Sequence, residues 1–155
     1  MLTKIFIGYA SWFGNTEKVA NEIGKAIDEL EGTQVLVKKI KDVEVKEVLD
    51  YDVILLGSPN HMGGPTRGIK KFIDTLGKLG IEGKKGAVFD TYVRKNVHIA
   101  KTVKKMEKRM NDKIPGLNLI VDGLSILVKG VKGPLVEGEL TKCADFGKKI
   151  FNNLN

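Results

Sequence analysis

Several features that would point to a particular protein class are missing from this chain of 155 residues. It has one cysteine, Cys143, so it can form neither an intramolecular disulfide nor a thiolate metal cluster. Its longest apolar runs, such as residues 53–56, are far shorter than the roughly 20 residues that span a bilayer. The N-terminus shows no signal-peptide pattern. We therefore expect one cytoplasmic globular domain over residues 1–155, with no membrane segment.

Common phosphate-binding and catalytic motifs are also missing. There is no G-x-x-x-x-G-K-[ST] sequence of the P-loop type and no G-x-G-x-x-G after the first predicted strand. Ser58 stands where a phospho-acceptor receiver domain carries an aspartate. We find no nucleophile, base and orienting group in an arrangement typical of covalent catalysis, and no metal site. His98 is expected at the surface, and Cys143 is expected as a small buried side chain on the last helix.

Short β-branched runs alternate with segments of helical periodicity, which favours a doubly wound α/β fold with a parallel sheet. The predicted strands are residues 3–9, 34–37, 52–57 and 85–91. The predicted helices cover residues 17–30, about 65–79, about 97–113 and 139–154. The expected buried stripe of the last helix consists of Leu140, Cys143, Ala144, Gly147, Ile150 and Phe151.

The segment from residue 117 to residue 128 allows two interpretations. Asp122-Gly123 between two apolar runs is a typical two-residue hairpin signal. The alternation of the whole chain instead requires a parallel strand here. We predict one interrupted fifth strand, which gives a doubly wound five-stranded parallel sheet.

The segment after the first strand combines hydroxyl, amide and glycine residues directly before a helix. Backbone N–H groups at such a helix N-terminus, with the positive end of the helix dipole, form a site suited to a phosphate. An ordinary helix cap by Asn15 or Thr16 is the alternative. Because no lysine or arginine lies in this loop, neutral donors would hold the phosphate, which suits a monophosphate group. The residues concerned are Ser11, Trp12, Phe13, Gly14, Asn15 and Thr16.

Three loops together resemble those of the flavodoxins. Residues 9–20 are similar to the FMN-phosphate loop and first helix of that family. Residues 52–59 followed by Gly63-Gly64-Pro65 are similar to its third strand and second flavin loop, and residues 84–92 to its fourth strand and third loop. The stretch Gly133-Pro134-Leu135 extends the resemblance to the whole chain. Phe13-Gly14 and residues 63–65 also resemble the flavodoxin-like domain of diiron flavoproteins.

The resemblance implies a flavodoxin-like sheet with the strand order 2-1-3-4-5 and FMN as the cofactor. It also assigns roles to the residues of the three loops. The first loop would bind the phosphate, although Phe13 stands where many flavodoxins carry a second hydroxyl. The second loop would lie along the isoalloxazine ring, with His61 in contact and with Gly63 able to reorient its peptide. The third would close over the ring, with Tyr92 stacked on it. The second and third loops comprise Pro59, Asn60, His61, Met62, Gly63, Gly64, Asp90, Thr91 and Tyr92.

This resemblance implies an FMN-binding electron carrier, monomeric and acting between redox partner proteins. The alternative is an FMN-dependent quinone or protoporphyrinogen oxidoreductase on the same fold. A nucleic-acid-binding role for the basic helix is weaker, since its lysines lack interleaved exposed aromatics.

The net charge of +7 is unevenly distributed along the chain. Residues 1–52 carry 7 basic and 10 acidic side chains, and residues 53–155 carry 19 and 9. Flavodoxins are commonly acidic, and Gly64 stands where many carry an acid. We therefore expect redox partners with an acidic docking face and a less negative potential for full reduction. Arg94 is the basic residue nearest Tyr92 in sequence, and most of the lysines between it and Lys113 are expected beyond about 8 Å, one Debye length, from the flavin.

Overall fold

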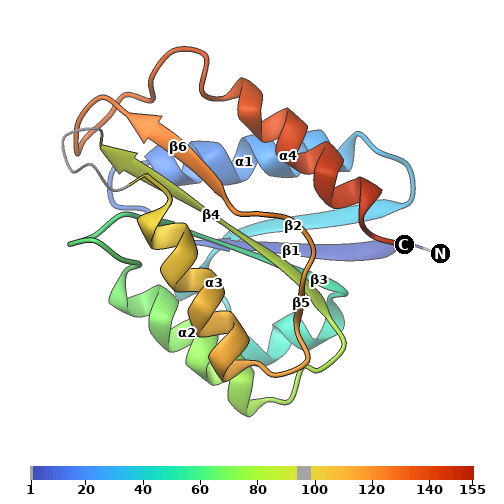
Figure 1. Ribbon diagram of the computed structural model, residues 1–155. Helices are drawn as coiled ribbons and strands as arrows, with labels where there is room; N and C mark the ends of the chain where they lie inside the picture. Colours follow the sequence, from blue (N-terminus) through green and yellow to red (C-terminus); the bar gives the residue numbers. More distant parts are fainter. Residues whose placement is uncertain (1, 94–98) are drawn as a thin grey trace.

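The computed structural model describes residues 2–93 and 99–155, and its centre is a parallel β-sheet (Figure 1). The strands follow the order β2-β1-β3-β4-β5, and β6 pairs with the second half of β4. This order confirms the predicted doubly wound topology. The strands are β1 (Thr3–Tyr9), β2 (Thr33–Lys39), β3 (Val53–Pro59), β4 (Lys85–Val93), β5 (Asn118–Leu119) and β6 (Leu124–Val128).

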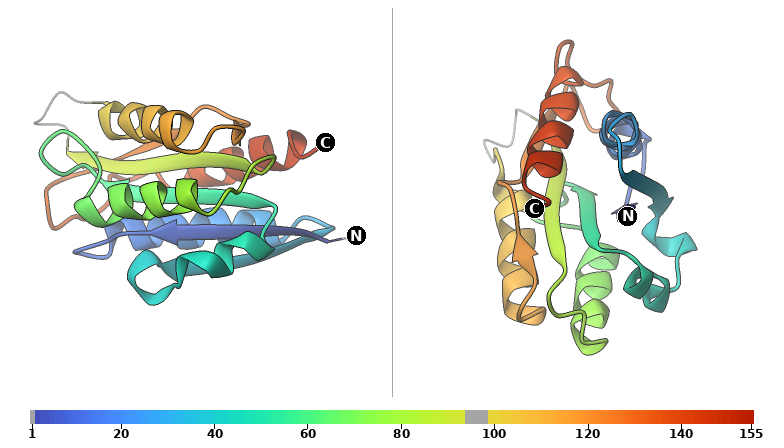
Figure 2. Two further views of the ribbon diagram at one scale, coloured as in Figure 1. Left: turned by 90° about the horizontal axis from the view of Figure 1, so that it is seen from below. Right: turned by 90° about the vertical axis from the view of Figure 1, so that its right-hand side faces the viewer.

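Helices cover both faces of the sheet (Figure 2). On one face, α1 and α4 pack over a core that includes Ile7, Leu55 and Phe89. On the other, α2 and α3 pack over Phe6, Leu56 and Val88. Because β1, β3 and β4 are buried on both sides, their sequences are apolar runs rather than alternating patterns. The helices are α1 (Asn15–Asp28), α2 (Arg67–Lys78), α3 (Lys101–Lys113) and α4 (Thr141–Asn152), with short 3-10 turns η1 (Ile40–Asp42) and η2 (Val45–Asp50).

The interrupted fifth strand is confirmed. Both β5 and β6 run parallel to β4, so Asp122-Gly123 is a break within one strand path and not a hairpin turn. At this break the chain lies close to its neighbours, since a Cβ atom at Gly123 would lie 2.2 Å from Val103 Cγ1. The Gly123 N–H donates to Glu107 Oε2. Gly123 is therefore explained by the close approach of the backbone to Val103, and not by a hairpin turn.

The buried face of α4 differs from the sequence-based expectation. In α4 the buried residues are Cys143, Phe146, Gly147 and Ile150, whereas Ala144 is exposed. The predicted stripe was therefore wrong at Ala144 and omitted Phe146, because α4 packs against both α1 and β6, and this packing buries Phe146. Cys143 is fully buried as predicted, and burial raises the pKa of its thiol to about 12. Within the described residues, none of the helices has the length and apolar character that crossing a bilayer requires.

Candidate functional site

A pocket lies at the carboxyl ends of the strands, where four connecting segments meet (Figure 1, at the tips of the β4 and β6 arrows). Parallel sheets of this topology bind ligands at this edge. The first two loops, the end of β4 and the segment after β6 all contribute to its walls. The lining residues are Ser11, Trp12, Phe13, Asn15, Thr16, Pro59, Asn60, Thr91, Tyr92, Val93, Val128 and Val131.

The first loop enters α1 without a side-chain cap. Gly14 occupies the N-cap position in the left-handed conformation (φ 87°), and its N–H donates to Ser11 Oγ at 3.1 Å. Neither Asn15 nor Thr16 is the N-cap, so the alternative of an ordinary side-chain cap does not hold. The first-turn N–H groups of an α-helix have no partner within the helix. They are available here to a ligand.

The only acid of the first turn of α1 is turned away from these N–H groups. Glu17 Oε2 accepts a hydrogen bond from the Tyr9 hydroxyl and lies 4.0 Å from Lys39 Nζ. Burial, with the Glu17 carboxylate beside it, raises the pKa of Tyr9. The tyrosine therefore remains a donor to Glu17, and the positive end of the helix faces the pocket without an internal anion.

Hydrogen bonds and close contacts hold the walls of the pocket together. The hydroxyl oxygens of Thr16 and Thr91 are 2.9 Å apart, and both side chains are buried. The Asn60 N–H donates to the Thr91 carbonyl oxygen. A Cβ atom at Gly133 would lie 2.6 Å from Asn15 Oδ1, so the last segment passes directly over that amide. The buried hydroxyls and the amide are thereby fixed in place.

The second loop contains a tight turn at residues 61–64. His61 and Gly64 exchange both backbone hydrogen bonds, and the two central residues, Met62 and Gly63, have positive φ of 50° and 80°. This is the signature of a type I′ turn, in which a non-glycine residue is strained. Met62 is nevertheless 93% exposed. The His61 ring meets the Trp12 indole edge-on at 4.7 Å, which joins the first two loops.

Not all the predicted residues of the second loop line the pocket. Pro59 and Asn60 do, whereas His61, Met62 and Gly64 line a groove on the side of α3. A Cβ atom at Gly63 would lie 3.2 Å from Lys101 Nζ, and one at Gly64 would lie 3.3 Å from Lys105 Cδ. Two lysines of α3 therefore adjoin this turn, which the sequence did not indicate. The predicted Arg94 and His98 lie outside the described residues.

Asp90 differs from its predicted place in the third loop. It lies within β4, is fully buried, and does not line the pocket. Its Oδ2 accepts from the Val103 N–H at 3.0 Å, in the first turn of α3. Ala100 precedes that helix and provides no side-chain cap. Asp90 therefore caps α3 from a neighbouring strand. Thr91 and Tyr92, by contrast, line the pocket.

Burial makes the charged form of Asp90 unfavourable. Desolvation raises its pKa to about 6, and the Val103 N–H and the Ser125 hydroxyl oppose this in part. Ser125 faces Asp90 across β4 and β6 without a hydrogen bond of normal geometry. Among the described residues, Asp90 Oδ1 and Ser125 Oγ are the buried side-chain polar atoms that lack a hydrogen-bond partner.

Replacing Asp90 should therefore change stability in a pH-dependent way. Burying the charged Asp90 carboxylate lowers the free energy of unfolding. Because the folded-state pKa is raised, this destabilisation is absent at pH 4, grows as the pH rises toward about 6, and is constant at higher pH. Asp90→Asn should raise the free energy of unfolding at pH 7 by up to about 3 kcal/mol, with little change at pH 4. Asp90→Ala, which removes the cap, should be destabilising at pH 4 by about 1 kcal/mol. Urea unfolding of all three proteins at both pH values measures this; an equal effect of Asp90→Asn at pH 4 and 7 would contradict it.

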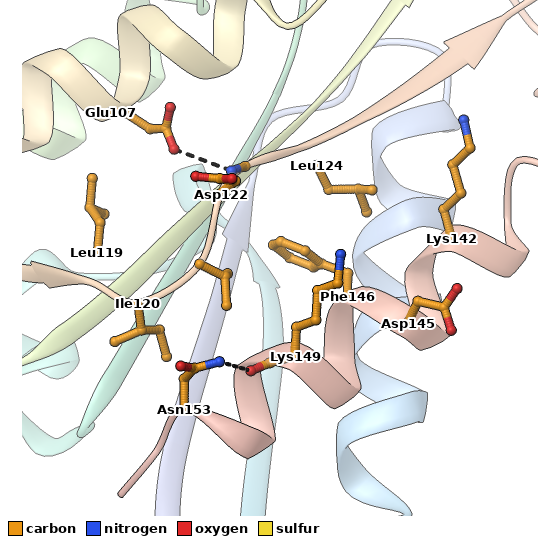
Figure 3. A pocket seen from close by; sticks show the side chains of 12 residues that line it. Glu107, Leu119, Ile120, Asp122, Leu124, Lys142, Asp145, Phe146, Lys149 and Asn153 are labelled. Carbon is orange, nitrogen blue, oxygen red and sulfur yellow. Dashed lines mark hydrogen bonds between the residues drawn. The ribbon is translucent and has the colours of Figure 1, made fainter.

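A second cleft lies away from these loops, at the break between β5 and β6 (Figure 3). Its walls carry Leu119, Ile120 and Leu124 on one side, and Lys142, Asp145 and Lys149 of α4 on the other. The charges that line it are of both signs. The pocket at the strand ends is the better candidate site, since it alone combines buried hydroxyls, aromatic side chains and an uncapped helix.

Sequence reasoning missed three residues of this pocket. Val93, Val128 and Val131 supply apolar walls, and Val131 is 69% exposed. An exposed valine in the loop before Gly133 was the one available signal. The sequence of β6 gave no such signal for Val128, because a valine at the end of an apolar strand is expected to be an ordinary core residue.

Comparisons with known proteins identify the family of this chain. A family model described as a flavodoxin domain matches residues 6–125. A flavodoxin from Clostridium beijerinckii is 32% identical over 148 residues, which are 94% of this chain and 98% of that protein. The crystal structure of oxidised flavodoxin 2 from Bacillus cereus superposes with a TM-score of 0.83 at 30% identity, covering 97% of this chain and 99% of that one.

The fold also matches a larger protein. The flavodiiron core of Flv1 from Synechocystis superposes with a TM-score of 0.76 at 18% identity, over 97% of this chain and 35% of that one. This likeness concerns the fold alone.

Proposed function

The chain belongs to the flavodoxin family, the FMN electron-transfer proteins, and on that basis we propose that its strand-end pocket is the FMN site of an electron carrier. The observation that carries this assignment is the uncapped N-terminus of α1, which opens beside buried hydroxyls. The cofactor would supply one- and two-electron transfer. The protein's own contribution is to bind it, orient it and exclude water from its phosphate.

The first loop would hold the phosphate. The donors are the backbone N–H groups at the start of α1, together with the side chains of Ser11, Asn15 and Thr16. Asn15 and Thr16 are at most 7% exposed, so a charge accepted there is shielded from solvent and each hydrogen bond to it is strengthened. A positive helix end without a cationic side chain suits a terminal monophosphate.

The aromatic residues at the pocket would bind the flavin ring. Trp12 and Tyr92 both line the pocket and offer flat apolar faces. Pro59 and Asn60 form the second loop's part of the wall, and Val128 and Val131 enclose it from the other side. We place Asp90 outside this set, because it caps α3.

The proposal includes the setting in which the carrier works. The family implies redox protein partners. We infer that these partners present an acidic face, since the carrier's net charge is +7. A single buried cysteine is consistent with a reducing cytoplasm, and residues 1–155 would act as one monomeric domain.

FMN uptake by the apoprotein tests the proposal directly. The chain has one tryptophan, Trp12, and it lines the pocket. We expect one equivalent of FMN per chain to bind, to acquire a perturbed visible spectrum and to quench the Trp12 fluorescence with the same saturation curve. The proposal would be wrong if the purified protein showed no flavin absorbance and its tryptophan fluorescence did not change when FMN was added.

A further inference from the structure

A groove between α2 and α3 is rich in positive charge. It starts at the turn of residues 61–64 and runs between the two helices, which lie side by side on one face of the sheet (Figures 1 and 2). Asp112 is the one carboxylate in its lining. The cations of this α2–α3 groove are Arg67, Lys70, Lys105, Lys108, Arg109 and Lys113.

Most of this charge is not neutralised within the part of the chain that the structure describes. Arg109 forms a bidentate pair with Asp74, at 2.9 and 2.7 Å, and Lys108 lies 2.6 Å from Asp112. Arg67, Lys70, Lys105 and Lys113 form no ion pair with any described residue. The groove thus presents at least four unpaired cations to a partner.

One of these unpaired cations, Arg67, lies where the electrostatics of its helix disfavour a positive charge. Neither α2 nor α3 has an acid in its first turn. Arg67 and Lys101 instead occupy the first helical positions, where the helix dipole disfavours a cation by about 0.3–1 kcal/mol. A residue that is unfavourable for its own helix, and that makes no compensating contact within the protein, is expected at a functional surface. Arg67 and Lys70 lie at the start of α2, and the other cations of the groove extend along α3 from Lys105 to its last turn.

The same end of the groove carries an exposed apolar residue. Met62 is 93% exposed and holds a left-handed conformation that is unfavourable for a side chain. Its neighbour His61 contacts Trp12 of the pocket. The groove and the proposed FMN site therefore share one rim. A flexible thioether on such a rim suits contact with another protein.

We propose that the α2–α3 groove, with Met62 at its rim, is the docking face for an acidic redox protein that exchanges electrons with the FMN. This inference rests on the proposed function and adds the surface and the chemistry of the partner. Cationic side chains would steer the acidic partner to the groove, and Met62 would contact it next to the pocket. An acidic protein is favoured over a nucleic acid, because the groove opens at the rim of the redox site and none of its described lining residues is a phenylalanine, tyrosine or tryptophan on which bases could stack.

Charge reversal inside and outside the groove tests the proposal. The groove variant is Lys70→Glu with Lys105→Glu. The matched control is Lys25→Glu with Lys148→Glu, exposed positions on α1 and α4 across the sheet. Both variants have the same net charge, so they differ only in where the charge was changed. Equal FMN content, measured first by absorbance, separates this test from that of the proposed function.

The readout is the second-order rate of electron transfer to an acidic rubredoxin. In stopped flow, one electron passes from the dithionite-reduced FMN of the protein to the ferric iron of the acceptor. At low ionic strength the groove variant should be at least 10-fold slower than wild type, and the control should change by less than 2-fold. Raising the salt from 0.01 to 0.3 M should slow wild type and leave the groove variant almost unchanged.

Three outcomes would overturn the proposal. Equal slowing of both variants would mean that only the net charge matters. A wild-type rate insensitive to salt would mean that the groove takes no part in docking. Tight, groove-dependent binding of a 20-base-pair DNA duplex at 0.15 M salt, without any effect on rubredoxin reduction, would show the groove to be a nucleic-acid site.

Discussion

Riboflavin should bind the apoprotein at least about 10³-fold more weakly than FMN, because it lacks the group that the first loop is built to hold. Three hydrogen bonds to a phosphate, at about 1.5 kcal/mol or more each, account for a factor of this size. The donors are preorganised, since Gly14 fixes the helix entry and Asn15 and Thr16 are buried. Titration of the apoprotein with both flavins, followed by Trp12 fluorescence, measures the ratio. A ratio near one would place the phosphate outside this loop.

Removing one donor should affect FMN alone. Thr16→Ala should raise the Kd of FMN by about 10- to 150-fold, the value of one hydrogen bond to a charged group, and leave the Kd of riboflavin almost unchanged. Thr16→Ser, which keeps the hydroxyl, is the matched control. Thr91→Val removes the hydroxyl that lies 2.9 Å from that of Thr16, and so breaks only the hydrogen bond between Thr16 and β4. Comparing it with Thr16→Ala separates the effect of this hydrogen bond from the effect of losing the phosphate contact. Parallel losses for both flavins would assign Thr16 a purely structural role.

Gly133→Ala should disrupt the same loop from the opposite side. Gly133 has φ 96°, where a side chain costs about 1–2 kcal/mol. The added methyl would also lie 2.6 Å from Asn15 Oδ1 and displace that amide. We expect a lower free energy of unfolding of the apoprotein and a loss of FMN affinity of 10-fold or more, the equivalent of about 1.4 kcal/mol.

Gly130→Ala is the control for this substitution. It lies in the same connecting segment, but its nearest neighbour would be 3.9 Å from the new Cβ, and its φ is not in the left-handed range. It should keep both stability and FMN affinity within about 0.5 kcal/mol of wild type. If Gly130→Ala and Gly133→Ala behave alike, the contact with Asn15 has no part in binding.

The resemblance of the three loops to one family pointed to the cofactor, and residues from all three loops line one pocket. Ser11 to Thr16 and Pro59-Asn60 are consecutive residues at the ends of strands, so their position follows from topology alone. Asp90 shows the limit of this reasoning. The sequence placed Asp90 near the end of a strand and beside the flavin, but in the structure its carboxylate accepts a hydrogen bond from the Val103 N–H of α3.

The sequence by itself determined the alternation of strands and helices, the interrupted fifth strand and the first loop, because these depend on the pattern of apolar runs and on residues adjacent in the chain. Only the tertiary structure decided that Lys101 and Lys105 adjoin the turn at residues 61–64, that Gly133 covers Asn15, and that the cations of α2 and α3 line one groove. The physical reason is that these contacts join segments up to 118 residues apart, and their geometry is set by how helices pack on a twisted sheet. A single sequence records which side chains are charged, but packing decides which of them share a surface.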